Sequence, residues 1–352
     1  MGSKMDALIK EMNKKAKEEI VTVGLSEYDY ERIPFTSPRM NYCTYGGLPV
    51  GKIIEFYGEE HGGKTTTALD IVSNFQYMER EKAKEDSNYE TRKVLYADCE
   101  NTLDTEWAMT LGVDVDDMII LRPIAQSAEQ IFQFIIDAVE TDEIGLWVID
   151  SLGVMLSQQE LEKDVEDKTY GGISMALTRF CKEAVMLMHK HKCTGIGINQ
   201  QRAKMNSPYG GLDTPGGKAW KFVCSVRLEF SRGRFFDENG TELTRGAESP
   251  VVNYVMMSMI KNKTCPPDRR TGFYTLRYAT GIDFLSDLIE VAIKYGIINK
   301  AGAWFTIINT ETGELLCPDK IQGQSHVYDL LMEDKELCST VAELVDAKMC
   351  EK

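Results

Sequence analysis

One eight-residue segment restricts the possible fold more than any other part of the chain. Residues 58–65 read Gly-Glu-Glu-His-Gly-Gly-Lys-Thr and fit the phosphate-loop pattern G-x-x-x-x-G-K-[ST]. An apolar run at 53–57 precedes the segment and a helical pattern follows it, as a strand, loop and helix require. The backbone N–H groups of such a loop surround phosphate oxygens at a helix N-terminus. We therefore predict an α/β protein that binds a nucleotide.

The predicted nucleotide site extends over the whole loop. Its residues are Gly58, Glu59, Glu60, His61, Gly62, Gly63, Lys64, Thr65 and Thr66. The Lys64 ammonium would neutralise the β- and γ-phosphates, and the Thr65 hydroxyl would be a ligand of Mg²⁺. A glycine turn without a ligand is the alternative.

Two further apolar runs end in carboxylates. Residues 146–149 lead into Asp150, which would hold Mg²⁺ beside the loop because parallel strands present their ligands at their carboxyl ends. Residues 94–97 lead into Asp98 and Glu100, and Glu100 is the candidate base that activates water for ATP hydrolysis. An ordinary aspartate at the end of a strand, as any α/β sheet can have, is the alternative for Asp150. A solvated loop acid is the alternative for Glu100.

The order of apolar runs indicates a mainly parallel sheet. The runs rich in β-branched residues lie at 53–57, 94–97, 118–121, 146–149, 195–198, 223–230, 255–260 and 273–278. Helical patterns separate the runs between 94 and 198, which is typical of parallel strands. The later runs follow one another with turn signals such as Glu238-Asn239-Gly240, which favour antiparallel hairpins at the far edge.

We predict three parts along the chain. Residues 1–45 contain a short oligomerisation helix over 5–19 and an irregular linker, and residues 46–282 form the ATPase core. Residues 283–352 form a small α/β C-terminal domain. The charged stretch 79–93 is expected to be a solvated helix end and loop.

Composition limits the classes of function and location. Forty basic and 55 acidic residues give a net charge of −15, so a polyanion must be held by a local basic patch. No apolar run approaches the roughly 18 residues of a membrane span, and the N-terminal residues lack a secretion signal. The nine cysteines contain no C-x-x-C pair, which favours a reducing compartment. We expect a cytoplasmic protein.

A long series of segments resembles the RecA family of bacterial strand-exchange recombinases and their phage-encoded relatives. It begins with Gly-Gly-Leu-Pro-Val-Gly-Lys-Ile-Ile-Glu-Phe-Tyr-Gly at 46–58 and ends with Ala-Gly-Ala-Trp-Phe at 301–305. The matching segments between them are 98–104, 111–114, 198–200, 216–217, 226–228 and 261–263. The resemblance implies a RecA-type P-loop ATPase core, with ATP and Mg²⁺ as cofactors.

The resemblance also implies roles for residues outside the loop. Glu100 would activate water, Asp104 and Trp107 would contact adenine, and Gln200 would sense the γ-phosphate. Three residues would act between subunits. Lys261 and Lys263 would reach the neighbour's nucleotide, and Phe222 would pack into the adjacent subunit, with a core phenylalanine as its alternative.

Two segments would hold DNA, namely 160–175 and 201–221. Their glycines suit mobile loops, their cations suit phosphates and their aromatic residues suit bases. The candidate residues, with one on the helix that follows the first segment, are Tyr170, Gly171, Lys182, Arg202, Lys204, Tyr209, Gly216, Gly217 and Lys218. A solvated basic loop is the alternative for the second segment.

We therefore expect an ATP-dependent recombinase of DNA recombination and repair. Its subunits would form a head-to-tail helical filament on single-stranded DNA and pair it with homologous duplex DNA. A hexameric helicase on the same core fold is one alternative, which predicts closed rings. A non-hydrolysing, nucleotide-gated mediator is the other, and Glu100 argues against it. A phage-encoded origin remains open.

Overall fold

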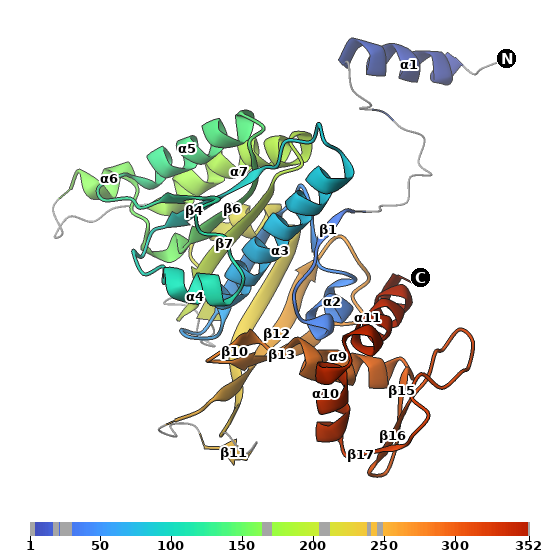
Figure 1. Cartoon of the computed structure of the whole chain (residues 1–352). Helices are drawn as coiled ribbons and strands as arrows, with labels where there is room; N and C mark the ends of the chain where they lie inside the picture. Colours follow the sequence, from blue (N-terminus) through green and yellow to red (C-terminus); the bar gives the residue numbers. More distant parts are fainter. Residues whose placement is uncertain are drawn as a thin grey trace. The chain divides into compact units, whose positions relative to one another are not determined.

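The computed structural model describes residues 4–16, 21, 30–163, 171–203, 212–237, 241–244 and 249–350 (Figure 1). The chain divides into two compact units, residues 1–31 and 32–352. The first unit contains helix α1 (Lys4–Ala16), which covers the described part of the helix predicted over 5–19. Its apolar side chains Met5, Leu8 and Met12 are exposed.

A ten-stranded sheet forms the centre of the second unit, in the order β14-β13-β12-β10-β3-β7-β6-β4-β5, with β11 paired to β10. The strands from β10 to β5 run parallel, and β10 to β14 pair antiparallel. Their bounds are β3 (Ile53–Gly58), β4 (Lys93–Asp98), β5 (Met118–Leu121), β6 (Ile144–Asp150), β7 (Thr194–Gln200), β10 (Val226–Phe236), β11 (Glu242–Leu243), β12 (Val252–Asn262), β13 (Thr271–Arg277) and β14 (Gly281–Ile282). The predicted mainly parallel sheet with an antiparallel edge is confirmed. The turn predicted at 238–240 lies outside the described residues.

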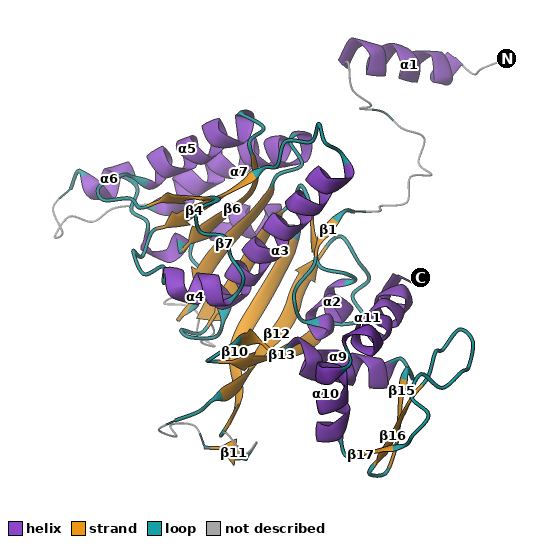
Figure 2. Cartoon of the chain, viewed as in Figure 1, coloured by secondary structure: helices purple, strands orange, loops and turns teal. Residues whose placement is uncertain are grey.

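Helices cover both faces of this sheet (Figure 2). The apolar cluster on one face includes α2 (Pro38–Thr44) and α3 (Lys64–Glu85). The cluster on the other face includes α5 (Ala128–Glu140), α7 (Ile173–Lys190) and α8 (Gly217–Val223). Shorter elements are α4 (Thr105–Thr110), α6 (Gln158–Leu161), a 3₁₀ turn (Leu152–Val154), the pair β1 (Arg32–Ile33) and β2 (Leu48–Pro49), and the pair β8 (Arg202–Ala203) and β9 (Leu212–Asp213).

Two glycines of β7 leave room for the largest side chains of the second cluster. A Cβ at Gly195 would lie 2.0 Å from the Trp147 ring, and one at Gly197 would lie 2.4 Å from the Trp220 ring. Both indoles are fully buried. The glycines of this strand therefore serve packing, which holds β6 and α8 against β7.

Two parts of the sequence prediction are wrong. The linker predicted within residues 1–45 is not irregular throughout, because the Ser37 side chain caps α2, with Pro38 at the first helical position. The stretch 79–93 is not fully solvated. Glu79 is 1% exposed and accepts hydrogen bonds from Tyr89 Oη at 2.7 Å and Arg92 Nη2 at 3.1 Å. This buried ion pair fixes the loop between α3 and β4.

The C-terminal part has an apolar core of its own. It comprises α9 (Phe284–Lys294), β15 (Ile298–Ala301), β16 (Trp304–Ile307), β17 (Ile321–Gln322), α10 (Gln324–Glu333) and α11 (Lys335–Cys350). The three strands form a separate antiparallel sheet. This arrangement agrees with the predicted small α/β domain at the C-terminus.

A buried acid joins this part to the core. Asp287 of α9 is 0% exposed and accepts hydrogen bonds from Ser37 Oγ at 2.5 Å and Thr275 Oγ1 at 3.0 Å. The Arg39 guanidinium lies 3.6 Å from the carboxylate. Burial outweighs these partners and raises the pKa of Asp287 to about 7. One side chain thus connects α2, β13 and α9.

The stability of the protein should depend on pH through this residue. The folded-state pKa of about 7 lies above the ordinary value of 3.8, so between these values the folded chain holds a proton that the unfolded chain releases. The free energy of unfolding should therefore fall as pH rises from about 4 to 7, by at most about 4 kcal/mol from Asp287 alone. Urea unfolding at pH 5 and pH 7.5 measures the part of this fall above pH 5, at most about 3 kcal/mol from Asp287.

Asp287→Asn removes the ionisation and keeps an acceptor for Thr275. We expect the variant to lose most of the difference in unfolding free energy between the two pH values. The exposed Asp319→Asn change should leave the difference intact. An Asp287→Asn protein with the wild-type pH dependence would show that other groups cause it.

Candidate functional site

The phosphate loop depends on two close backbone approaches. β3 ends at Gly58 (φ +145°), where a Cβ would lie 1.9 Å from the Phe230 carbonyl oxygen of β10. Gly63 (φ +90°) is the last residue before α3, and a Cβ there would lie 2.6 Å from Val255 of β12. Only glycine fits both positions. The antiparallel strands β10 and β12 therefore pack directly against the phosphate loop.

The side chain of Lys64 folds back onto the backbone of the phosphate loop. Lys64 is 8% exposed, and its Nζ donates hydrogen bonds to the carbonyl oxygens of Gly58 at 3.3 Å and Glu59 at 2.5 Å. Burial lowers the pKa of Lys64, while the negative charges of Asp150 and Glu100 act in the opposite direction. Glu59, Glu60 and His61 are exposed.

Asp150 and Thr65 lie together at the carboxyl end of the sheet. The Thr65 hydroxyl and the Tyr96 hydroxyl each donate a hydrogen bond of 2.8 Å to the Asp150 carboxylate. Burial raises the pKa of Asp150. A hydroxyl beside a carboxylate fits Mg²⁺, which takes few protein ligands and completes its shell with phosphate and water. The described residues hold no cluster of three or more His, Cys, Asp or Glu side chains suited to a metal.

Glu100 connects the neighbouring strand ends. Its carboxylate accepts hydrogen bonds from Ser151 Oγ and from Gln200 Nε2, the latter at 3.1 Å. Ser151 follows Asp150 directly, so the two side chains that could hold Mg²⁺, Thr65 and Asp150, are adjacent to the candidate base Glu100. Gln200 ends β7, and Arg202 begins β8 two residues later. The structure therefore brings Lys64, Thr65, Asp150, Glu100 and Gln200 to one edge of the sheet.

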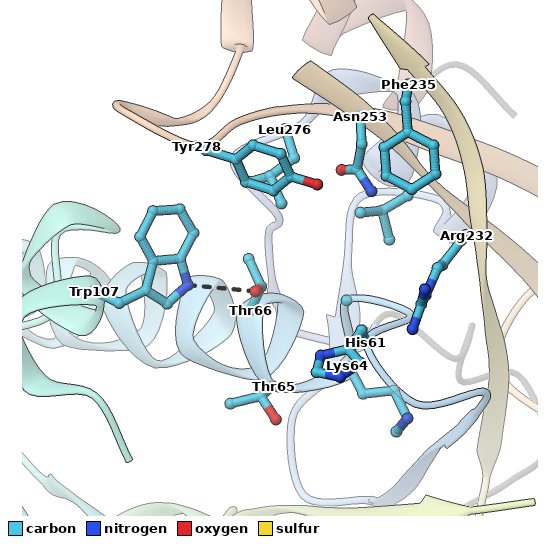
Figure 3. A pocket seen from close by; sticks show the side chains of 12 residues that line it. His61, Lys64, Thr65, Thr66, Trp107, Arg232, Phe235, Asn253, Leu276 and Tyr278 are labelled. Carbon is cyan, nitrogen blue, oxygen red and sulfur yellow. Dashed lines mark hydrogen bonds between the residues drawn. The ribbon is translucent and has the colours of Figure 1, made fainter. Parts of the chain in front are cut away.

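A pocket of about 560 Å³ opens beside the loop (Figure 3). The loop and the start of α3 line one side, and Trp107 of α4 lines another, with its Nε1 donating to Thr66 Oγ1 at 3.4 Å. Asp104 does not line the pocket. Its carboxylate caps α4 by accepting a hydrogen bond of 3.0 Å from the Trp107 backbone N–H.

Sequence reasoning missed the far wall of the pocket. This wall consists of Arg232, Phe235, Asn253, Val255, Leu276 and Tyr278, which come from β10, β12 and the end of β13. They lie more than 160 residues after the loop, and no local motif marks them. The one available signal is Asn253, a polar residue in an alternating strand pattern whose neighbours at the same phase are apolar.

The three predicted interface residues lie together at the C-terminal end of α8. Phe222 is 72% exposed. Lys261 Nζ and Lys263 Nζ donate hydrogen bonds to its carbonyl oxygen at 3.0 and 3.2 Å. The core alternative for Phe222 is therefore wrong, because its ring faces solvent in this chain.

The two lysines lie away from the chain's own phosphate loop. In the register of the sheet, Lys261 of β12 lies opposite Arg227 of β10. Arg227 in turn lies opposite Glu55 of β3, three residues before Gly58. Three strand residues correspond to about 10 Å, and Lys263 lies farther in the same direction. Both lysines are thus at the end of β3 opposite to the loop.

The described flanks of the two predicted DNA segments meet. β8 and β9 pair to close the base of the second segment, and Arg202 Nη2 donates to the Gly153 carbonyl oxygen at 2.8 Å. Gly216 precedes α8 and lies against Leu177 of α7, the helix that Gly171 and Gly172 precede.

The remaining predicted DNA residues differ in how well the structure places them. Gly217 lies beside Ser174 of α7, and Lys218 is exposed. Lys182 is exposed. It lies nine residues after Ile173, about 14 Å along α7, so it is not at the base of the predicted DNA segment 160–175. Three predicted contacts, Tyr170, Lys204 and Tyr209, lie outside the described residues.

Among the helices in the described ranges, none has the length and apolar character to cross a bilayer.

A family model described as the RecA N-terminal domain matches residues 3–283. Protein RecA of Ruminococcus albus is 30% identical over 92% of this chain and 74% of that protein. Protein RecA of Sulfurimonas denitrificans is 33% identical over 86% of this chain and 80% of that protein. Protein RecA of Chloroherpeton thalassium is 32% identical over 86% of this chain and 77% of that protein. The phosphate loop, the strand-end carboxylates and these similarities agree, and the chain belongs to the RecA family.

Proposed function

We propose that the strand-end cluster around Glu100 is where this protein hydrolyses ATP and passes the state of the nucleotide to DNA. As a RecA-family member, the protein is a DNA-dependent ATPase of recombination and repair that uses ATP and Mg²⁺. It forms filaments on single-stranded DNA and pairs them with duplex DNA. The observation that carries the proposal is the contact of Glu100 with both Ser151 and Gln200.

Binding uses residues that are already oriented. The loop N–H groups and Lys64 would hold the phosphates, with Lys64 exchanging the carbonyl oxygens of Gly58 and Glu59 for phosphate oxygens. Thr65 and Asp150 would hold Mg²⁺, which supplies positive charge at the β- and γ-phosphates. Trp107 and Tyr278 border the space for the flat base. Asp104, which caps α4 beside Trp107, would also contact adenine.

Hydrolysis requires a base that holds the attacking water. Glu100 is half-buried and lies two residues after β4 ends, and it would accept the proton of that water. Gln200 donates to the same carboxylate and begins the connection to β8. Rotation of this amide towards a γ-phosphate would break its contact with Glu100 and move the base of the 201–221 segment. This link would couple ATP to DNA binding.

The 160–175 and 201–221 segments would form the DNA site. The contacts between Gly216 and α7 place the described flanks of both segments side by side. Arg202, Lys218 and the glycines 171, 216 and 217 would contact the DNA backbone, with Tyr170, Lys204, Tyr209 and Lys182 as further candidates. Contacts to phosphates carry no sequence information, which suits the pairing of any homologous sequence.

Steady-state ATP hydrolysis with and without single-stranded DNA tests this function. We expect hydrolysis that increases when single-stranded DNA is added. Absence of turnover under both conditions would favour the nucleotide-gated mediator. Hydrolysis coupled to duplex unwinding by closed rings would favour the helicase.

Lys261, Lys263 and Phe222 would complete the active site between subunits. Both lysines lie at the end of β3 opposite to the loop of their own chain, which supports a role at a neighbour's nucleotide, where their charges would stabilise the transition state. A heterologous contact of this kind repeats without closing and builds a filament. We propose that residues 1–45 assist assembly, that 46–282 form the core and that 283–352 form the C-terminal domain. We also propose a bacterial cytoplasmic location, and a phage-encoded origin stays a hypothesis.

Phe222→Ala should weaken filament assembly without unfolding the monomer. The ring is 72% exposed, so its removal leaves no cavity in this chain but removes an apolar anchor of the interface. We expect the protein concentration needed for half-maximal assembly on single-stranded DNA to rise at least about tenfold. Light scattering measures assembly. Met186→Ala, which removes another exposed apolar side chain, is the matched control.

Assembly of Phe222→Ala at the wild-type concentration would show that the ring is not part of the interface. A circular dichroism melt of the DNA-free monomer checks the fold. We expect the variant to melt within a few degrees of the wild-type protein.

A further inference from the structure

A buried tyrosine hydroxyl lies beside the pair of side chains that would hold Mg²⁺. Tyr96 of β4 donates a hydrogen bond of 2.8 Å to Asp150 Oδ2, the same oxygen that accepts from Thr65. Tyr96 is 0% exposed and Asp150 is 8% exposed. The other carboxylate oxygen, Oδ1, accepts no hydrogen bond from a residue that the structure describes. The two donors therefore restrict one oxygen of Asp150 and leave the other for a metal and its waters.

The register of the sheet places this tyrosine. Asp98 of β4 lies opposite Asp150 of β6, and Tyr96 lies opposite Val148. Tyr96 is therefore on the same face of the sheet as Asp150, two residues or about 7 Å before it along the strands. A tyrosine side chain that leans along its strand spans this distance, so the hydroxyl reaches the carboxylate at the strand end.

Packing alone does not require a hydroxyl at this position. Tyr96 belongs to the apolar cluster between the sheet and α3, which also contains Val94, Val148 and Ile71. A phenylalanine would fill the same space. A fully buried hydroxyl is costly unless it has a hydrogen-bond partner. Among the described residues, the partner of the Tyr96 hydroxyl is Asp150, so the hydroxyl serves that carboxylate.

Carboxylates that bind metals are usually held by hydrogen bonds of their own, and loss of such a partner weakens metal affinity about 10- to 100-fold. We propose that Tyr96 is a positioning residue for Mg²⁺. Its hydroxyl fixes the orientation of the Asp150 carboxylate and so raises the affinity of the site for the metal. This inference rests on the proposed function, in which Thr65 and Asp150 hold Mg²⁺ beside bound ATP.

The Mg²⁺ dependence of nucleotide binding tests this role without hydrolysis. Binding of a fluorescent ATP analogue is followed at equilibrium while Mg²⁺ is titrated at fixed pH, and a separate titration of the analogue contains EDTA and no Mg²⁺. Tyr96→Phe removes the donor and keeps the ring. Tyr89→Phe is the matched control, because it removes a hydroxyl that donates to another carboxylate, Glu79 Oε2 at 2.7 Å, towards the far end of α3.

We expect Tyr96→Phe to need at least about tenfold more Mg²⁺ for half-maximal binding, and to bind the analogue in EDTA as the wild-type protein does. Steady-state hydrolysis should show the same shift in Mg²⁺ requirement and should return to the wild-type kcat at saturating Mg²⁺. Tyr89→Phe should keep the wild-type Mg²⁺ dependence. A purely structural role would not give this pattern, because a loosened pocket binds more weakly with and without the metal.

A second set of variants tests whether Tyr96 acts through Asp150. Asp150→Asn alone should raise the Mg²⁺ requirement. Adding Tyr96→Phe to it should change that requirement by less than about twofold, because the carboxylate that Tyr96 orients is already gone. An equal shift from Tyr96→Phe in both backgrounds would overturn the proposal.

Two further results would also overturn it. One is a Mg²⁺ requirement of Tyr96→Phe within about twofold of the wild-type value, and the other is equal weakening of binding with and without Mg²⁺. Circular dichroism checks the fold of each variant. Tyr96→Met, a flexible side chain without a donor, should give the same shift as Tyr96→Phe and replaces it if that variant does not fold.

The wild-type titration separates failure of this inference from failure of the proposed function. Wild-type binding of the analogue that does not depend on Mg²⁺ would contradict the assignment of Thr65 and Asp150 to the metal. Wild-type binding that depends on Mg²⁺, with no shift in Tyr96→Phe, would contradict only the role of Tyr96.

Discussion

Lys64→Ala should lower DNA-dependent ATP hydrolysis at least about 10²- to 10³-fold, the loss typical of removing one oriented group that stabilises transition-state charge. The Lys64 ammonium is buried, and it lies within the phosphate loop, where it donates to the carbonyl oxygens of Gly58 and Glu59. Alanine leaves no positive charge at the start of α3 to meet the β- and γ-phosphates. Steady-state release of phosphate with saturating single-stranded DNA measures the effect.

The fold of this variant should survive. Burial already disfavours the charged form of Lys64, so its removal relieves a desolvation cost as well as removing two hydrogen bonds. Lys84→Ala, an exposed lysine near the other end of the same helix, should keep wild-type turnover. Wild-type turnover in folded Lys64→Ala would contradict the assignment of the site.

Glu100→Gln should lower kcat by about 10²- to 10⁴-fold, while ATP binding changes little. Glutamine keeps an oxygen that can accept from Ser151 and Gln200, so the local hydrogen bonds can persist. It cannot take a proton from water. Single-turnover hydrolysis measures the chemical step, and nucleotide competition measures binding. A kcat within about twofold of the wild-type value would remove Glu100 as the base.

Mixing two inactive variants tests whether the site spans subunits. Glu100→Gln lacks the base, and Lys263→Ala lacks a charge that lies at the far end of β3 from its own loop. In a mixed filament, some interfaces pair an intact Glu100 with an intact Lys263. We expect the mixture to hydrolyse ATP faster than either variant alone. Turnover equal to the mean of the two variants would place Lys263 outside the active site.

The elements nearest the loop were predictable because local patterns determine them. The apolar run before Gly58, the glycines and the helical pattern after Lys64 all agree with the structure around β3 and α3. The strand-end acids Asp150 and Glu100 were predictable for the same reason, since parallel strands carry their ligands to one edge. The structure adds the hydrogen bonds that connect these groups, from Thr65 to Asp150 and from Ser151 and Gln200 to Glu100.

Other features depend on partners distant in sequence. In the sequence, Glu79 is one charged residue among many in a charged stretch. It is a buried acid in the structure because the chain folds back and brings Arg92, thirteen residues later, into contact with its carboxylate. Tyr278 and Asn253 line the pocket because the antiparallel pairing of β10, β12 and β13 brings them over the loop. No spacing rule predicts that register. The helix at 38–44 was missed although Ser37 and Pro38 are a normal helix start, because the surrounding prolines and glycines suggested a linker.

Electron microscopy of the protein on long single-stranded DNA tests the central claim most directly. Samples would contain Mg²⁺ with a non-hydrolysable ATP analogue, and the control would lack nucleotide. The account predicts continuous helical filaments with the analogue and few or none without it, because ATP binding favours the assembled, DNA-bound state. Closed rings or isolated particles in the presence of the analogue would contradict it.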